Sequence, residues 1–435
     1  MTQHFHILRA CRVAKLHMAA LIVGALLSPV QDCSAQAPPQ PIYKMQPLGT
    51  LPGQPNSDRA FVTQVAQAAP APPAPPADQV ADGAAQPLNP PASASTPAVS
   101  QESVAPNMIG DAFGLPFLET INGFIVPLPG GGVGTSKIAE NSSPIPRDRV
   151  YLNYSYFNSV PLLATGVDVN RFTPGIEKTF FEGMSSIEVR TPFASTLSNN
   201  LFADGTTNTD STEFGNLTVY LKQLFYTSDT LAVSGGLGLT LPTAGDSTVF
   251  LAAGLPPLIN IRNQSVHLLP FLGSLYTPTD QLFVQQFLQF DFDANGNAIS
   301  IDDGGGTLIP AGRLNDQTVL YYSIGGGYWL YDNPNSDRLF TRIAPIVELH
   351  YNKSLTGTDG LLNANVIGVN LTGSNLDLLN GVVGMTAMMG ENKSLTLAYT
   401  TPLGAGDNRQ FNGELRVMFN WYFGGSASRF SRVQF

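Results

Sequence analysis

Apolar and polar side chains alternate along the second half of this sequence, and this two-residue period constrains the fold more than any other feature. The clearest run is "ELRVMFNWYF", which begins at Glu414. Leu415, Phe419 and Trp421 fall on one face of this run, whereas Glu414 and Arg416 fall on the other. An extended strand places alternate residues on opposite faces, so the pattern predicts a strand that is half apolar and half polar.

Similar alternation recurs along the chain and gives 11 candidate strands with the one above, most of them 8–14 residues long. Tilted strands that cross a bilayer need about this length. The other candidates lie near 150–157, 178–191, 217–222, 230–241, 265–276, 281–292, 318–331, 339–352, 378–390 and 393–401.

The links between these strands alternate in length. Short links fall at 227–229, 277–280, 332–338 and 391–392, and long links fall at 191–213, 242–264, 293–317 and 353–377. Outer-membrane barrels have short periplasmic turns and longer external loops. The alternation therefore predicts an all-β fold, an antiparallel up-and-down transmembrane β-barrel, with its long links at one end.

The number of strands must be even if both ends of the barrel chain lie in the periplasm. We expect about 12, with the segment 115–128 supplying a strand before 149, and 10 or 14 remain open. A strand at 428–435 is a competing way to reach an even number. Unpaired backbone groups are costly in lipid, so the sheet must close. A cylinder of this size should enclose solvent, unless the loops or the N-terminal segment plug it.

The N-terminal third of the chain, before the alternating region, has a different composition. Residues 1–35 have a basic start, an apolar run and small residues before a cleavage point, which predicts a signal peptide for export. A short buried helix and a lipoprotein signal at Cys33 are alternatives. Residues 36–108 hold 16 of the 34 prolines and predict a disordered linker, with a binding arm as the alternative. We expect a Gly/Pro-containing transition segment at 109–148, the barrel at 149–423 and a tail at 424–435.

Composition excludes several classes of protein. Charged residues make up only 12% of the chain, and no stretch of 18 or more apolar residues follows the predicted signal peptide, which argues against a helical membrane protein. Without that peptide the chain has 19 basic and 31 acidic residues, so a nucleic-acid partner is not expected. Both cysteines, Cys11 and Cys33, leave with the peptide. We expect neither a disulfide scaffold nor a cofactor.

Several strings resemble a family of exported porin-like proteins from planctomycete bacteria. They are "SKIAENSSPIPRDRVYLNYSYFN" at 136–158, "DVNRFTPGIEKTFFEGMSSIEVRTPF" at 168–193, "PFLGSLYTPTDQLFVQQFLQFDFDANGN" at 270–297, "TRIAPIVELHY" at 341–351 and "FNGELRVMFNWYFG" at 411–424. The resemblance implies an outer-membrane location and a porin-like or transport role, and it carries over no functional residue. More loosely, the layout is similar to the barrel transporters of phenol-degradation pathways, at the level of the fold.

Polar residues opposite the apolar faces are the main candidate site. They would line the lumen and filter solutes by charge and size, or they would pair with one another and stabilise a wet interior. The candidates are Lys178, Glu182, Glu188, Arg190, Lys222, Arg342, Glu348, His350, Glu414 and Arg416.

Two weaker motifs concern histidines and calcium. Only His267 and His350 follow the signal peptide, and a row of polar lumen residues explains His350 better than a catalytic triad does. Asp291, Asp293, Asn295 and Asp302 match the spacing of a calcium loop, although a polar hairpin is the favoured interpretation.

We therefore predict an outer-membrane channel for passive or weakly selective passage of small solutes, and no enzyme. The alternative is a structural or surface-exposed barrel with a plugged lumen and loops that bind partners. A barrel enzyme or a secreted all-β protein is the third option. Expected partners are outer-membrane lipid, small solutes in the lumen, an envelope partner for the linker and further copies of the chain.

Overall fold

A computed structural model describes residues 105–111, 117–120, 125–130, 133–161, 166–195, 198–202, 211–334, 336–357, 361–362, 370–373, 376–404 and 409–423. The predicted signal peptide, the linker up to residue 104 and the tail at 424–435 lie outside the described residues. In the part of the chain that is described, no helix is long and apolar enough to cross a bilayer.

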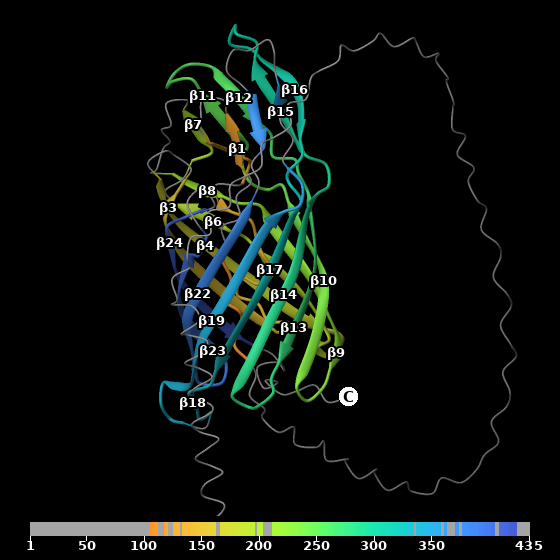
Figure 1. Cartoon of the computed structure of the whole chain (residues 1–435), viewed down its shortest axis with the longest axis vertical. Coiled ribbons are helices and arrows are strands. Elements are labelled where there is room, and N and C mark those ends of the chain that lie inside the picture. Colours follow the sequence, from red (N-terminus) through yellow and green to blue (C-terminus); the bar gives the residue numbers. More distant parts are fainter. Residues whose placement is uncertain are drawn as a thin grey trace, which may run out of the picture. The chain divides into compact units, whose positions relative to one another are not determined.

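Antiparallel strands form a closed barrel. Within the described residues it has 12 strands, each hydrogen-bonded to two neighbours, and β3 closes it by pairing with both β24 and β4 (Figure 1). In chain order the strands are β3 (Arg149–Val160), β4 (Val167–Phe180), β5 (Ser185–Arg190), β9 (Leu217–Thr227), β10 (Leu231–Leu241), β13 (His267–Tyr276), β14 (Leu282–Asp293), β17 (Val319–Tyr328), β19 (Phe340–Ser354), β22 (Asp377–Met389), β23 (Lys393–Pro402) and β24 (Gly413–Tyr422).

The long links share one end of the barrel, as the sequence predicts. Because neighbouring strands are antiparallel, successive links lie at opposite ends of the barrel. One end, which we call the short-turn end, carries the links 181–184, 228–230, 277–281, 329–339 and 390–392. The other, the long-loop end, carries the long links 191–216, 242–266, 294–318 and 355–376, together with the shorter links 161–166 and 403–412. The prediction that the long links share one end is confirmed.

The twelfth strand is not the one that we expected. The segment 178–191, expected to be one strand, contains a sharp turn, so that β4 and β5 form a hairpin. Phe181, Glu182 and Gly183 all have positive φ (48°, 57° and 88°), which reverses the chain within three residues. As a result β3 begins at the short-turn end, and no strand is needed before it. The segment 115–128 supplies β1 (Phe117–Thr120) and β2 (Ile125–Pro127), which lie outside the barrel sheet.

Loop strands form two small sheets beyond the barrel, as far as the structure describes them. β7 (Asn200–Phe202), β11 (Ser247–Phe250), β12 (Pro257–Ile261), β15 (Asn297–Asp302) and β16 (Leu308–Leu314) make a five-stranded sheet at the long-loop end (Figure 1). β1 and β2 pair with β21 (Asn370–Gly373), which pairs with β20 (Leu361–Leu362). The chain segment before the barrel is therefore tied to the loop between β19 and β22.

The barrel is apolar outside and polar inside. On β24, Leu415, Phe419 and Trp421 are exposed on the outer face, whereas Glu414 and Arg416 are fully buried on the inner face. This confirms the two faces predicted for the strand. Other strands repeat the pattern: most exposed side chains of the outer face are apolar, whereas the inner face holds most of the charged side chains together with some apolar ones such as Phe283 and Phe287. Such a distribution opposes that of a protein in water and suits a barrel surrounded by lipid.

Candidate functional site

Two stretches of chain before β3 fill the interior of the barrel. They are residues 105–111 and 133–148, which we call the plug. Every plug residue is buried except Thr135 and Ile145, which are half-buried. Residues 105–108, the end of the segment expected to be disordered, thus pack inside the barrel, as do residues 109–111 and 133–147 of the transition segment. The lumen is occupied, which was the stated exception to an open, solvent-filled cylinder.

Glu348 on β19 holds the first stretch by its backbone. Its carboxylate accepts hydrogen bonds from the amides of Ile109 (2.7 Å) and Gly110 (2.9 Å). From another strand, β24, the Arg416 guanidinium donates to the Ile109 carbonyl (2.7 Å). Hydrogen bonds with a charged partner are about twice as strong as neutral ones. The barrel wall therefore clamps two successive peptide groups.

The second stretch is held in the same way. Arg190 donates to the Lys137 carbonyl (2.7 Å), and Gln289 accepts from the Ile138 amide (2.6 Å). Lys222 donates to the Ser143 carbonyl (2.8 Å). Wall residues that bond to the plug come from all around the barrel, namely from β3, β4, β5, β9, β14, β19, β22 and β24. The plug thus spans the lumen and does not line one side of it.

Asp111 and Lys137 link the two stretches by an ion pair of 3.1 Å. The second oxygen of the Asp111 carboxylate accepts hydrogen bonds from Asn352 and Asn380, each at 2.7 Å. Lys137 also donates to Asn352 (3.2 Å). Both charges are completely enclosed, so this pairing is needed to offset their desolvation.

Two glycines lie where the plug packs too closely to admit a Cβ atom. Gly110 has a φ of +82°, and a Cβ there would lie 2.7 Å from the Cα of Glu140. On the wall, a Cβ at Gly384 would lie 2.7 Å from the Ile109 side chain. Backbone cannot yield at the first of these contacts, so a residue larger than glycine would force the two stretches apart.

The predicted lumen residues divide into two groups. Glu188, Arg190, Lys222, Arg342, Glu348, His350, Glu414 and Arg416 face the interior. Lys178 and Glu182 do not, which corrects the expectation for these two. Lys178 has a side chain that is 60% exposed and pairs at the short-turn rim with Asp148, the last residue before β3, and Glu182 lies in the exposed turn between β4 and β5. The segment 178–191 was predicted to be one continuous strand, so Lys178 and Glu182 were assigned to the inner face.

The interior charges pair with one another as well as with the plug. Arg149 bridges Glu177 (2.8 Å) and Glu188 (3.1 Å), and Lys222 lies 3.1 Å from Glu177. Arg190 pairs with Glu188 at 3.0 Å. Sequence reasoning missed Arg149 and Glu177, although alternation from Val150 and Ile176 places both on the inner face. The described structure therefore has a paired, charge-rich wall.

His350 lies in a chain of hydrogen bonds that resembles a catalytic triad. Its Nδ1 is 2.8 Å from the Ser323 hydroxyl, and its Nε2 is 2.9 Å from the Glu348 carboxylate. In serine hydrolases the nucleophile faces Nε2 and the carboxylate faces Nδ1, the reverse of this order. Glu348 is also occupied by the plug. The geometry favours a positioning role, in which His350 orients Glu348.

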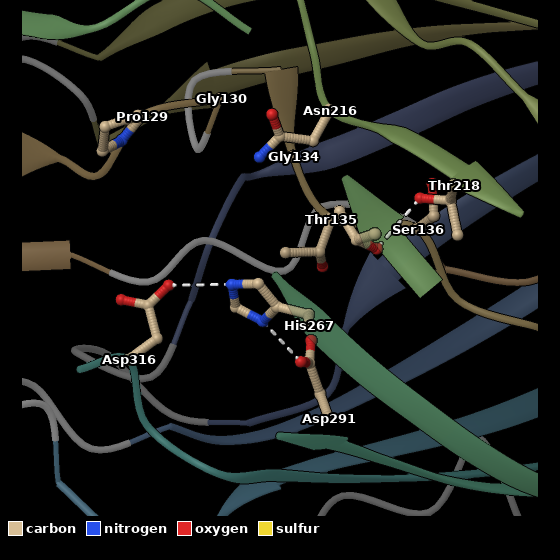
Figure 2. A pocket seen from close by; sticks show the side chains of 11 residues that line it. Pro129, Gly130, Gly134, Thr135, Ser136, Asn216, Thr218, His267, Asp291 and Asp316 are labelled. Carbon is tan, nitrogen blue, oxygen red and sulfur yellow. Dashed lines mark hydrogen bonds and ion pairs between the residues drawn. The ribbon is translucent and has the colours of Figure 1, made fainter. Parts of the chain in front are cut away.

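A small pocket opens at the long-loop end, above the plug. Its lining includes His267 and Asp291 from the wall, Asp316 from the link before β17, and Thr135 and Ser136 from the plug (Figure 2). His267 lies between the two carboxylates, with its Nδ1 2.7 Å from Asp291 and its Nε2 3.4 Å from Asp316. Burial raises the pKa of Asp316 above its ordinary value. This pocket is acidic and has an imidazole at its centre.

The residues of the candidate calcium loop are spread over two elements. Asp291 and Asp293 end β14, and Asn295 lies in the turn before β15. The Asp293 carboxylate accepts hydrogen bonds from the amides of Asn295 (3.0 Å) and Gly296 (2.8 Å), which is how an aspartate fixes a tight turn. Asp302 ends β15 and accepts from the amide of Gly306. Calcium binding by these four residues remains a prediction.

Several solved structures of porins and channels are similar to this chain at low identity. A channel of the outer membrane from Pseudomonas putida F1 is 10% identical, covers 65% of this chain and 97% of its own, and has a TM-score of 0.45. The KdgM porin is 11% identical over 63% of this chain and 100% of its own, with a TM-score of 0.33. The CymD monoaromatic hydrocarbon channel is 11% identical over 64% of this chain and 89% of its own, with a TM-score of 0.36. No family model and no curated protein matches the sequence. Function is therefore argued from the geometry of this chain.

Proposed function

We propose that this chain is an outer-membrane channel for small solutes, closed in the present conformation by its own plug. The closed sheet and the apolar outer face support a location in lipid, because no strand edge is left unpaired there. The predicted signal peptide and the resemblance to exported porin-like proteins support the outer membrane as the destination.

The observation that carries the proposal is how the plug is held. Charged and polar wall side chains bind its peptide groups, as Glu348 binds Ile109 and Gly110. Water can replace such hydrogen bonds at modest net cost, whereas the apolar contacts of Ile109 and Ile138 with buried wall side chains are lost when the plug moves. Displacing the plug would leave a wall that carries both signs of charge, including Arg190 and Glu188. A lumen of this kind would hydrate and pass solutes with weak charge selectivity.

A second function is favoured by the plug itself. A structural barrel has no need of an open lumen, and its loops would act on the outside. The five-stranded sheet at the long-loop end has its own apolar core, including Val249, Ile259 and Ile301, and could present a binding surface. In this second account the plug never leaves, and no solute crosses.

Solute flux through liposomes separates the two functions. We would compare the full chain with a variant in which residues 105–111 are replaced by a Gly/Ser segment of equal length. A channel predicts slow swelling of native-protein liposomes in small sugars and fast swelling for the variant. Folding of both is checked by the faster electrophoretic migration of unheated barrels. A folded variant as impermeable as the native protein would support the structural barrel instead.

A further inference from the structure

Four side chains from separate parts of the chain meet in the pocket region at the long-loop end. His267 begins β13 and lies directly opposite Asp293 in the register of β13 and β14. Asp291 is two residues before Asp293, and Asp316 precedes β17. Figure 2 shows the His267 ring between Asp291 and Asp316. One imidazole therefore faces three carboxylates, a donor set that cations of transition metals accept.

The spacing fits ligands of a shared ion. One ligand atom each from His267, Asp293 and Asp316 lies within 4.8 Å of the other two. The distance from His267 Nε2 to the Asp316 carboxylate is 3.4 Å, longer than the roughly 2.7–2.9 Å of a charge-assisted hydrogen bond. Two ligands bonded at about 2.0–2.1 Å in a tetrahedral site lie roughly 3.4 Å apart.

Asp291 holds the imidazole in the orientation that a ligand needs. Its carboxylate is 2.7 Å from Nδ1, a partner for the tautomer that is protonated at Nδ1. In that tautomer Nε2 directs its lone pair toward Asp316. Histidines that bind metals nearly always donate their other ring N–H to a carboxylate, a carbonyl or water in this way.

The carboxylates keep free acceptor positions. Asp293 Oδ1 accepts from two amides and the Ser265 hydroxyl, whereas its Oδ2 accepts only from the Asp316 amide (2.8 Å) among the described residues. Asp316 Oδ1 is buried and has no hydrogen-bond partner in the described part of the chain. The buried Ser136 hydroxyl, on the plug side of the pocket, also has none there. These unpaired buried atoms indicate a missing polar or charged ligand.

We propose that His267, Asp293 and Asp316 bind one divalent transition-metal ion, of the type of Zn²⁺, Co²⁺ or Ni²⁺, at the outer mouth of the barrel. Asp291 orients His267, and the fourth coordination position faces the pocket beside Ser136. Any proton on Nε2 is released to solvent when the ion binds. A site with imidazole and few free oxygens disfavours Ca²⁺ and Mg²⁺. The ion would join β13, β14 and the segment before β17 above the plug. The site does not depend on whether the barrel conducts solutes.

The competing account has no metal. In it His267 is a protonated imidazolium that simply pairs with Asp291 and Asp316. This account predicts no specific metal uptake, so binding measurements decide between the two.

Metal titration of the full chain tests the proposal. The protein, free of any histidine tag, is treated with chelator in detergent and titrated calorimetrically with Zn²⁺ and with Co²⁺. We expect one ion per chain, and visible absorption bands of four- or five-coordinate Co²⁺. His267→Gln and Asp316→Asn should each weaken binding by more than about 100-fold, and Asp291→Asn by about 10–100-fold. Asp302→Asn, outside the cluster, should bind like the native protein.

Two outcomes would overturn the site. One is the absence of saturable binding of Zn²⁺, Co²⁺ and Ni²⁺ to folded native protein near neutral pH. The other is equal binding by native protein and by folded His267→Gln, which would place the metal elsewhere. Preferential binding of Ca²⁺ that survives His267→Gln but is lost in Asp302→Asn would also overturn it, and would favour the calcium loop.

Discussion

Replacing Glu348 by alanine should expose the plug to water-soluble reagents about 100 times more often than in the native barrel. The substitution leaves two buried amides, those of Ile109 and Gly110, without their charged acceptor. Each such loss costs about 1.5–3 kcal/mol, and about 3 kcal/mol in total shifts an opening equilibrium by roughly 100-fold. The reporter is Ile109→Cys in a chain with Cys11 and Cys33 replaced by serine. Its rate of reaction with a membrane-impermeant maleimide follows the open population.

Glu182→Ala is the matched control, since it removes an exposed carboxylate from the turn between β4 and β5. It should leave the labelling rate unchanged. Fast labelling at position 109 in the otherwise native background would mean that the plug is not held, and equally slow labelling in folded Glu348→Ala would mean that Glu348 does not hold it.

Phe419→Arg should prevent assembly of the barrel in membranes. Phe419 is on the outer face of β24, between Leu395 of β23 and Leu152 of β3 in the pairing register. Arginine facing lipid near the bilayer midplane of a barrel costs about 2–4 kcal/mol. Assembly is measured as the fraction that migrates as compact barrel without heating. Phe419→Leu and Leu330→Arg are the controls, the latter at an exposed position in a short-turn link. Normal assembly of Phe419→Arg would show that this face does not meet lipid.

Strand faces were predictable because they follow from one local rule. Once Leu415 is assigned to the outside, alternation assigns Glu414 and Arg416 to the inside, and the structure confirms it. The same rule failed at 181–183, where the chain turns from β4 into β5. Only Gly183 indicates a turn in the sequence. Phe181 and Glu182 also adopt positive φ, which is uncommon for these residue types and could not be predicted.

The plug could not be found by the same reasoning. Its residues are held through peptide groups, which every sequence has, as well as through side chains such as Asp111 and Lys137, and no side-chain period marks the segment. The charged residues Lys137, Glu140 and Arg147, in a stretch otherwise rich in Gly, Ser and Pro, were the available signal. Because the plug fills the lumen, we expect Asn420→Arg to be poorly tolerated although position 420 faces the interior. Asn420 contacts Asn141 and Arg149, so an arginine there would meet a like charge in a filled interior.

The cluster of His267, Asp293 and Asp316 depends on the pairing register of β13 and β14, which could not be predicted from the sequence alone. His267 faces Asp293 only because the turn at 277–281 fixes how β13 and β14 pair. A shift of one residue would move His267 away from Asp293 and turn one of the two strands inside out. Asp316 comes from a third segment, and its approach requires the long link from β15 to β17 to return to the barrel rim.

Ion conductance across a planar bilayer tests the central claim, a channel closed by its own plug, most directly. The account predicts long closed periods for the native chain and frequent steps of one unit conductance for Glu348→Ala, at equal amounts of folded protein. Steps of the same size in rare native openings would show that both states belong to one channel. A folded Glu348→Ala barrel whose plug labels readily at position 109 but which never conducts would contradict the account.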